Sequence, residues 1–380
     1  MRITRRESLA MALALAVAGG ARAQAPGPDS LAALARRTGR RFGSTVGAGP
    51  SKGLTGSFAD PRYRALLAAQ CDVIVPENEL KWTRIRPSAA RFEYRGADRL
   101  LAFAEEHRMA YRGHTLLWHH PRWTPAWVFK HDFGANPKTE AERMIREHIS
   151  KVCRRYGTRI YSYDVVNETI DNETGVMRET PFSKHLTGEG VCDLAFHVAR
   201  EAAPHAQLVY NDYMSWTPGS AKHRAGVLKL LEGFRRRGTP VDALGIQAHI
   251  GGGDLSTRQE AEWRRFLDEV VAMDYDLMIS EMDINDRYLP PEITGRDRTI
   301  ADVARAYLDL MLGYRQMGDI LMWGMVDRYS WLQGFTPRTD KLPLRPTPYD
   351  SEFKPKLLRE AIAAALAAAT TNHVPGKRAT

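Results

Sequence analysis

The feature that most constrains this chain is a regular alternation of short apolar runs with longer helix-like stretches. Eight runs rich in Val, Ile, Tyr and Leu occupy residues 42–47, 72–76, 110–118, 160–167, 207–212, 243–249, 277–283 and 320–326. Helix-like stretches between them include residues 97–107, 139–156, 220–237, 258–273 and 300–317. Strands that alternate with helices are joined by crossovers and run parallel. Nearly continuous apolar strands are typical of a sheet covered on both faces.

Eight such units predict an α/β fold, a single (β/α)8 TIM barrel. The competing fold is an open doubly wound sheet. The segment GSTVGAGPSKG (43–53) after the first run lacks the glycine spacing of a phosphate-binding turn, which favours the barrel. A length of 380 residues fits one barrel with long loops. We therefore expect one barrel domain over residues 26–370 and a disordered tail over residues 371–380.

Residues 1–25 have the pattern of an export signal. Arg2, Arg5 and Arg6 precede an apolar run over residues 9–18, which is too short to cross a membrane. Small-x-small cleavage patterns follow at residues 21–25. The segment TRRESL (4–9) is similar to a twin-arginine motif. These features predict an exported protein, periplasmic or secreted.

Charge and cysteine content exclude several other classes. The formal net charge is +9, but the arginines are scattered and no nucleic-acid-binding module accompanies them. No apolar run after the leader reaches 18 residues, so no interaction with a membrane is expected. Cys71, Cys153 and Cys192 have the spacing of neither a disulfide framework nor a zinc cluster. Buried thiols are expected, with a Cys153–Cys192 bridge as the alternative.

Polar and aromatic residues gather where the predicted strands end. In a β/α barrel these ends meet at one face, where the active site forms. Amides and carboxylates that can bind hydroxyls, mixed with aromatic rings that can cover C–H faces, point to a carbohydrate site. The residues concerned are Glu77, Asn78, Lys81, His114, Trp118, Asn167, Glu168, Asn211, Tyr213, Gln247, His249, Glu281, Asp283, Trp323 and Trp331.

Glu168 and Glu281 are the candidate catalytic carboxylates, because strands four and seven can face each other across the barrel mouth. Alternation places Glu281 and Asp283 on the same side of their strand, with His249 on the adjacent strand. A histidine between two carboxylates stabilises their ionised forms, which makes Glu281 the nucleophile. The charge on Glu281 would then raise the pKa of Glu168, the acid/base.

Nine motifs resemble glycoside hydrolase family 10, the endo-β-1,4-xylanases, over about residues 40–360. The resemblance implies a retaining endo-acting hydrolase of xylan and xylo-oligosaccharides that needs no metal or organic cofactor. It assigns Glu168 as acid/base and Glu281 as nucleophile, and places Glu77, Asn78 and Lys81 on the non-reducing-side sugar. It also implies that Asn167 binds the 2-hydroxyl of the cleaved sugar, whose subsite is lined by His114, Trp118, Gln247, His249, Trp323 and Trp331. The motifs are VPENELKW (75–82), RGHTLLWH (112–119), DVVNET (164–169), RETPF (178–182), LVYNDY (208–213), GIQAHI (245–250), ISEMDI (279–284), WGMVDRYSW (323–331) and FKPK (353–356).

The sequence departs from the family pattern after strand three. The family usually reads WHSQ-x-P-x-W there, whereas this chain has WHHPRWTPAW (118–127), without the glutamine and about two residues longer. Tyr163 replaces a common Trp, and Leu332 a frequent Arg. We expect His119 and His120 to be non-catalytic; Trp123 and Trp127 are either loop packing or sugar platforms.

Two other functions stay open from sequence alone. One is a metal-dependent barrel amidohydrolase that recruits His114, His119, His120, His249 and Asp283. The other is a non-catalytic glycan-binding barrel, against which the presence of both carboxylates argues. Activity on cellulose-like glucans would depend on how Glu77 and Trp323 pack around the extra hydroxymethyl group of glucose. A monomer is expected.

Overall fold

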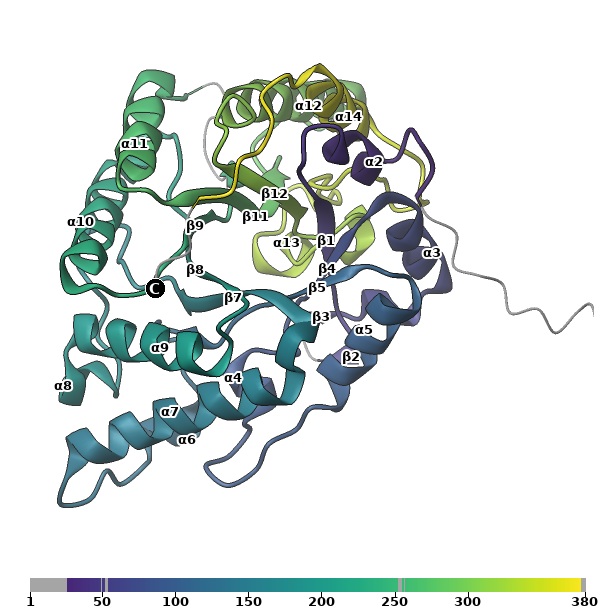
Figure 1. Ribbon diagram of the computed structural model, residues 1–380. Coiled ribbons are helices and arrows are strands. Elements are labelled where there is room, and N and C mark those ends of the chain that lie inside the picture. The colour runs from purple at the N-terminus through teal and green to yellow at the C-terminus, as the bar shows by residue number, and fades with distance from the viewer. Residues whose placement is uncertain (1–25, 49, 52–53, 252–254, 256, 377–380) are drawn as a thin grey trace, which may run out of the picture.

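The computed structural model describes residues 26–48, 50–51, 54–251, 255 and 257–376, and its centre is a closed barrel of parallel strands (Figure 1). In spatial order the barrel strands are β1 (Phe42–Val46), β4 (Val73–Pro76), β5 (Ala110–Gly113), β7 (Ile160–Asn167), β8 (Gln207–Asp212), β9 (Ala243–Ile246), β11 (Asp276–Asn285) and β12 (Met317–Met322). Pairing of β12 with β1 and of β9 with β11 closes the ring. The predicted barrel is therefore confirmed.

Two of the predicted strands are interrupted. The run over residues 110–118 forms β5 and, after a break at residues 114–116, the short β6 (Leu117–Trp118) on β7. The run over residues 243–249 forms β9 and, after residues 247–248, β10 (His249–Gly251) on β11. Both breaks fall at the carboxyl end of a strand and include predicted site residues, His114 and Gln247.

Helices surround the barrel on its outer side (Figure 1). The longer ones are α3 (Pro61–Gln70), α5 (Arg95–Glu106), α7 (Pro137–Tyr156), α9 (Gly188–Ala202), α10 (Ala221–Arg237), α11 (Glu260–Ala272), α12 (Ile293–Met311) and α14 (Leu357–Ala368). Shorter helices are α2 (Leu31–Arg36), α4 (Trp82–Ile85), α6 (Ala126–Phe129), α8 (Ser183–Leu186) and α13 (Leu332–Phe335), and β2 (Pro50–Ser51) pairs with β3 (Leu54–Thr55) as a hairpin.

One helix lies earlier in the chain than predicted. The sequence pattern predicts a helix over residues 300–317, whereas α12 begins at Ile293 and ends at Met311. The Glu292 side chain accepts hydrogen bonds from the first backbone N–H groups, Thr294 and Gly295, which fixes the earlier start. The chain then turns and enters β12 at Met317.

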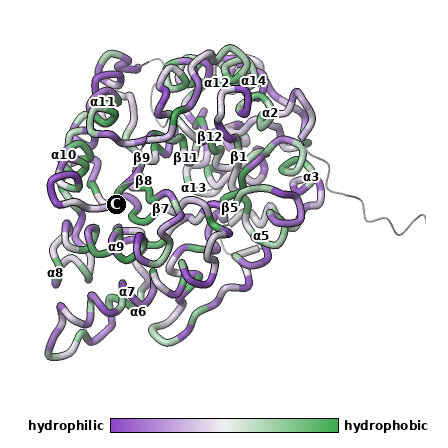
Figure 2. The backbone as a smooth tube through the Cα atoms, in the orientation of Figure 1, coloured by the Kyte–Doolittle hydropathy of each residue, from purple (hydrophilic) through white to green (hydrophobic). Residues whose placement is uncertain are grey.

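The apolar core has an outer and an inner layer. Hydrophobic residues follow the strands and the inner faces of the helices, while polar residues lie outside (Figure 2). Within the barrel, a small separate cluster consists of Val73, Val75, Val209, Ala243, Met278 and Leu321. Cys71, Cys153 and Cys192 are buried free thiols, so the structure contains no Cys153–Cys192 bridge. No described helix is both long and apolar enough to span a bilayer.

A buried ion pair lies inside the barrel next to the inner cluster. Both guanidinium ends of Arg112 on β5 donate to the two carboxylate oxygens of Asp164 on β7. Arg112 also contacts the Met278 sulfur, at 3.3 Å. Neither charged side chain is more than 1% exposed. Because a buried ion is costly without its partner, each charge depends on the other.

Residues 371–376, which the sequence assigns to a disordered tail, form hydrogen bonds with the barrel in the structure. Backbone N–H groups of His373 and Val374 donate to carbonyl oxygens of Thr38 and Arg315, both at 2.8 Å. Gly376 N donates to the Asp276 carboxylate at 2.7 Å. This segment returns from α14 toward the start of β11 (Figure 1). Residues 377–380 and the predicted leader 1–25 lie outside the described residues.

Replacing Arg112 by Met should destabilise the fold by about 3–5 kcal/mol, because the buried charge of Asp164 would lose its guanidinium partner and keep only the contact with His114. The matched control is Arg305→Met, which breaks the exposed pair with Asp309 on α12 and should cost about 1 kcal/mol or less. Reversible denaturant unfolding measures both. Equal losses in the two variants would contradict the structural role of the buried pair.

Candidate active site

The predicted nucleophile, Glu281, lies on β11 and is only 4% exposed. Asn211 Nδ2 donates to its Oε1 at 2.7 Å, and His249 Nε2 lies 3.3 Å from its Oε2. His114 Nδ1 lies 3.8 Å from Oε1. Burial opposes ionisation of Glu281, but His114 and His249 outweigh it and lower the pKa of the carboxyl. Glu281 is therefore held as a carboxylate.

His249 bridges two carboxylates, as strand alternation predicts. Its Nδ1 lies 2.9 Å from Asp283 Oδ1, opposite the contact between Nε2 and Glu281. Burial acts against the charge of the ring, yet Asp283 and Glu281 raise the pKa of His249 to about 10. Trp331 Nε1 donates to the second Asp283 oxygen at 2.7 Å. The imidazolium and the Trp331 ring are thus oriented by the same aspartate.

Asn211 on β8 orients Glu281 from the other side. Its amide oxygen accepts a hydrogen bond from Ser280 Oγ at 2.6 Å, which directs the Nδ2 group toward Glu281. Gly245 on β9 leaves room for this amide, since a Cβ atom there would lie 2.3 Å from Asn211 Oδ1. A side chain at this position would push the amide away from the carboxylate.

Glu168, the predicted acid/base, follows β7 with a backbone φ of +56°. This left-handed conformation costs a non-glycine residue about 1–3 kcal/mol. The Glu168 N–H donates to the Asn211 carbonyl oxygen at 2.9 Å, which holds the turn. Gln247 Nε2 donates to Glu168 Oε1 at 3.0 Å. The turn and the amide fix the direction of this carboxyl.

The environment of Glu168 is opposite to that of Glu281. Burial raises the pKa of Glu168 to about 7, with smaller contributions from the negative charges of Asp212 and Glu281. The expectation that Glu281 raises this pKa is thus correct in direction, but burial is the largest cause and Asp212 contributes more than Glu281. At neutral pH a substantial fraction of Glu168 carries a proton while Glu281 does not.

Residues after β4 form one side of the site. Lys81 Nζ donates to Asn78 Oδ1 at 3.1 Å and lies 4.7 Å from the Trp118 ring centre and 5.5 Å from that of Trp323. Burial lowers the pKa of Lys81, opposed by the carboxylates of Glu281, Glu77 and Glu168. This side therefore combines one ammonium group with several acceptors.

Aromatic rings line the same region. His114 and Trp323 meet edge to face at 5.1 Å, and Trp331 lies 5.1 Å from His249. Asn167 has partners for its whole amide when its oxygen accepts from Trp118 Nε1 and its nitrogen donates to the Asn211 carbonyl oxygen, both at 3.2 Å. On the Glu168 side, the Tyr213 hydroxyl accepts from Arg178 at 2.7 Å and donates to Asn172 at 3.0 Å.

The loop that departs from the family pattern divides into two parts. His119 is buried against the Arg178 carbonyl oxygen, and burial lowers its pKa to about 4. Trp127 Nε1 donates to the Arg86 carbonyl oxygen at 3.0 Å. This contact favours loop packing over a sugar platform for Trp127. Trp123 instead stacks on Trp118, with ring centres 4.9 Å apart, and extends the aromatic wall.

Sequence reasoning missed several residues that act through the site residues. Asp164 lies 2.9 Å from His114 Nδ1 and ties that ring to Arg112. Asp212 contributes to the raised pKa of Glu168, and Ser280 orients Asn211. A sequence signal was present for the first pair: Arg112 precedes His114 by two residues and Asp164 precedes Glu168 by four, spacings that alternation assigns to one face of a regular strand.

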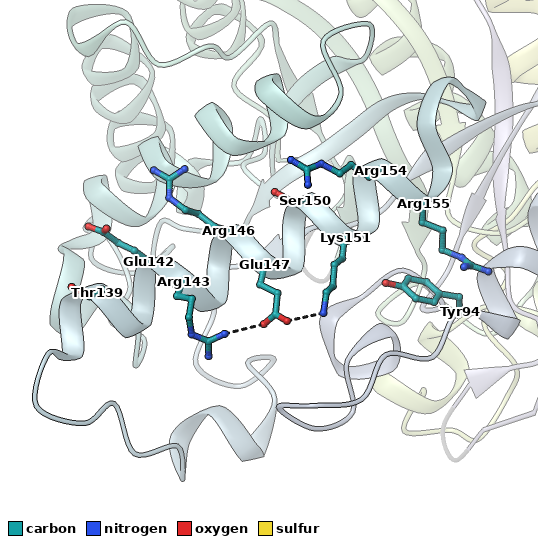
Figure 3. Close-up of a pocket in the computed structure, with 10 residues that line it drawn as sticks. All are labelled: Tyr94, Thr139, Glu142, Arg143, Arg146, Glu147, Ser150, Lys151, Arg154 and Arg155. Carbon is teal, nitrogen blue, oxygen red and sulfur yellow. Dashed lines mark hydrogen bonds and ion pairs between the residues drawn. The ribbon is translucent and has the colours of Figure 1, made fainter.

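A surface hollow along α7 does not offer comparable chemistry (Figure 3). Its central carboxylate, Glu147, is paired with Arg143 at 3.2 Å and Lys151 at 2.7 Å, and also with Arg86. Among the described residues, no three His, Cys, Asp or Glu side chains are grouped so that they could hold a metal ion. The amidohydrolase alternative has no support from this geometry.

Comparisons with known proteins agree with the geometry. The family model described as glycosyl hydrolase family 10 matches residues 30–365. "Endo-1,4-beta-xylanase A" of Caldicellulosiruptor saccharolyticus is 32% identical over 306 residues, 77% of this chain and 86% of that protein. "Endo-1,4-beta-xylanase B" of Paenibacillus barcinonensis is 30% identical over 302 residues, 76% of this chain and 87% of that protein.

Solved structures agree in fold. Native xylanase 10B from Thermotoga maritima superposes with a TM-score of 0.78 at 28% identity, over 89% of this chain and 98% of that chain. Xylanase 10B from Thermotoga petrophila, solved in complex with xylobiose, gives a TM-score of 0.78 at 27% identity, over 89% of this chain and 97% of that chain.

The carboxyl group of Glu168 should titrate near pH 7 in the free protein. Glu281→Gln should lower this midpoint, because one negative charge is removed, yet leave it above the usual value of 4.5, because burial remains. Carbon-13 NMR of glutamate-labelled protein follows the carboxyl shift directly. A midpoint that does not move in the variant would disprove the charge coupling, and one that falls to 4.5 would disprove the effect of burial.

Proposed function

The chain belongs to glycosyl hydrolase family 10, and we propose that it is an endo-1,4-β-xylanase whose catalytic pair is Glu168 and Glu281. The observation that carries the residue assignment is that the surroundings of the two buried carboxyls shift their pKa values in opposite directions, upward for Glu168 and downward for Glu281. A protonated carboxyl can give its proton to the glycosidic oxygen of the leaving sugar. An ionised carboxyl can attack the anomeric carbon. The substrate follows from the family and from the names of its characterised relatives.

In the first step, Glu281 attacks the anomeric carbon while Glu168 gives its proton to the glycosidic oxygen. The bond to the leaving sugar breaks and an ester with Glu281 forms. Asn211 Nδ2 and His249 Nε2 hold the attacking carboxylate in place, and its negative charge is lost when one of its oxygens forms the ester bond. The protonated fraction of Glu168 falls as the pH rises through about 7, so this step slows on the alkaline side.

In the second step, Glu168 takes a proton from water, and the hydroxyl attacks the anomeric carbon. The ester breaks, Glu281 recovers its charge, and the product keeps the β configuration after two inversions. Esterification of Glu281 removes one of the negative charges that raise the pKa of Glu168. Glu168 is therefore more easily deprotonated between the two steps, as a general base requires.

The remaining polar groups support a role in holding the sugar chain. Glu77, Asn78 and Lys81 would bind the non-reducing-side sugar through hydroxyl hydrogen bonds. Asn167, close to Trp118 and Asn211, would bind the 2-hydroxyl of the cleaved sugar. Trp323 is 7% exposed and packs between two histidine rings, which favours the narrow xylose ring over glucose with its hydroxymethyl group.

Glu281→Ala should lower kcat on linear xylo-oligosaccharides by several orders of magnitude, and Glu168→Ala by about 10²–10⁴-fold. Added azide should yield the β-xylosyl azide with Glu168→Ala, since it replaces water on the ester. It should yield the α-azide with Glu281→Ala, since it replaces the nucleophile. Proton NMR of the products distinguishes the two.

Glu142→Gln, which changes a carboxylate in the α7 hollow, is the matched control and should keep kcat within about twofold, as surface substitutions usually do. Exchange of the two azide configurations would reverse the assigned roles, and full activity of either alanine variant would remove its residue from the mechanism.

We also propose that residues 1–25 direct export and that the mature enzyme acts as a periplasmic or secreted monomer. The charged start, the short apolar run and the small-x-small sites support this destination. An extracellular location suits an enzyme whose substrate is too large to enter a cell. Sedimentation analysis of the purified enzyme tests the monomer.

Expression of the full chain in a bacterial host should give a periplasmic product whose N-terminus begins just after Ala23 or Ala25. The double variant Arg5→Lys, Arg6→Lys should keep the precursor in the cytoplasm if the twin-arginine route is used. Intact-mass spectrometry of cell fractions measures both. An uncleaved wild-type chain in the cytoplasm would contradict export.

A further inference from the structure

Arg122 lies between aromatic rings from two different loops. Its guanidinium carbon is 4.7 Å from the centre of the Trp123 ring and 5.6 Å from that of Phe335. Trp123 belongs to the loop after β6, and Phe335 ends α13, after β12. Two segments more than 200 residues apart therefore meet through one cation.

The two rings continue into the walls of the catalytic site. Trp123 stacks on Trp118 at 4.9 Å with an interplanar angle of 22°, and Phe335 lies 4.6 Å from Trp331. In the barrel, β1 and β4 lie between β12 and β5. The contact made by Arg122 therefore spans the sector of the rim that contains Glu77, Asn78 and Lys81, the side proposed to hold the non-reducing-side sugars.

The backbone around Arg122 is well fixed. Its N–H donates to His120 Nδ1 at 3.1 Å, and the Thr124 hydroxyl donates to the His120 carbonyl oxygen at 3.1 Å. The Trp123 N–H donates to the same carbonyl at 3.0 Å. The side chain is thus held at the rim of the cleft by a short turn and by stacking.

Arg122 differs from the other cations of the site, Lys81 and His249, because it has no carboxylate partner among the described residues. Lys81 has several carboxylates around it, and His249 has two. Across the described part of the chain, no acidic side chain forms an ion pair with the exposed Arg122 guanidinium. A guanidinium that stacks on aromatic faces keeps its in-plane N–H donors available for a carboxylate.

We propose that Arg122 is a specificity residue that binds the carboxylate of a uronic-acid substituent on the sugar chain next to Glu77, Asn78 and Lys81. The inference rests on the proposed xylanase function and adds a substrate class, acidic decorated xylan. A neutral backbone would give this cation no partner, whereas a carboxylate at the rim would form charge-assisted hydrogen bonds with it.

The test compares three oligosaccharides of equal backbone length: one linear, one with a single glucuronyl substituent, and the same decorated molecule with its carboxyl group reduced to an alcohol. The wild-type enzyme should show a kcat/KM about tenfold higher for the acidic than for the reduced form, as one charge-assisted hydrogen bond provides. Arg122→Gln should bring this ratio close to one, and Arg122→Lys should restore part of it. Added salt should lower the wild-type ratio.

Arg154→Gln, which removes an exposed cation from the outer helix α7, is the matched control and should keep the wild-type ratio. Circular dichroism verifies that each variant is folded. A wild-type ratio of one, or an equal ratio in wild type and Arg122→Gln, would overturn the role of Arg122. A preference for the reduced form would overturn it in favour of a steric barrier. Failure to cleave even the linear oligosaccharide would overturn the xylanase function itself, together with this inference.

Discussion

The catalytic site depends on keeping one carboxylate charged in a place that water hardly reaches. Glu281 would lose its charge to burial if His114 and His249 did not contact it from two sides. Those rings are in turn held by aspartates, Asp164 for the first and Asp283 for the second. The chain of contacts extends to the barrel interior, so the protonation state of Glu281, the proposed nucleophile, depends on the whole fold.

Glu168 shows that residue type alone does not decide the protonation state of a carboxyl group. It is the same amino acid in the same barrel mouth, yet neutral neighbours such as Gln247 and negative ones such as Asp212 surround it. Its backbone has the left-handed conformation, which costs free energy but sets the direction of the carboxyl group. Two glutamates thus acquire opposite pKa shifts, which suit the two roles proposed for them, from the burial and the charges around them.

The sequence was sufficient to predict the barrel and most of the side chains that the structure brings together at its mouth, because strand periodicity and residues at strand ends are local signals. The contact of His249 with both Glu281 and Asp283 followed from alternation alone. The breaks within residues 110–118 and 243–249 did not, because they arise from pairing with neighbouring strands. The ranking of the causes that raise the pKa of Glu168 also required coordinates, because a sequence motif does not show how deeply a side chain is buried.

The ordered segment after α14 has a practical meaning. Through His373, Val374 and Gly376 it is attached near the beginnings of β11 and β12, whereas the carboxylates project from the opposite rim. Residues 373–376 therefore lie on the face of the barrel away from the proposed substrate cleft. Attaching the enzyme to a bead through this face would leave the cleft pointing outward toward an insoluble polymer.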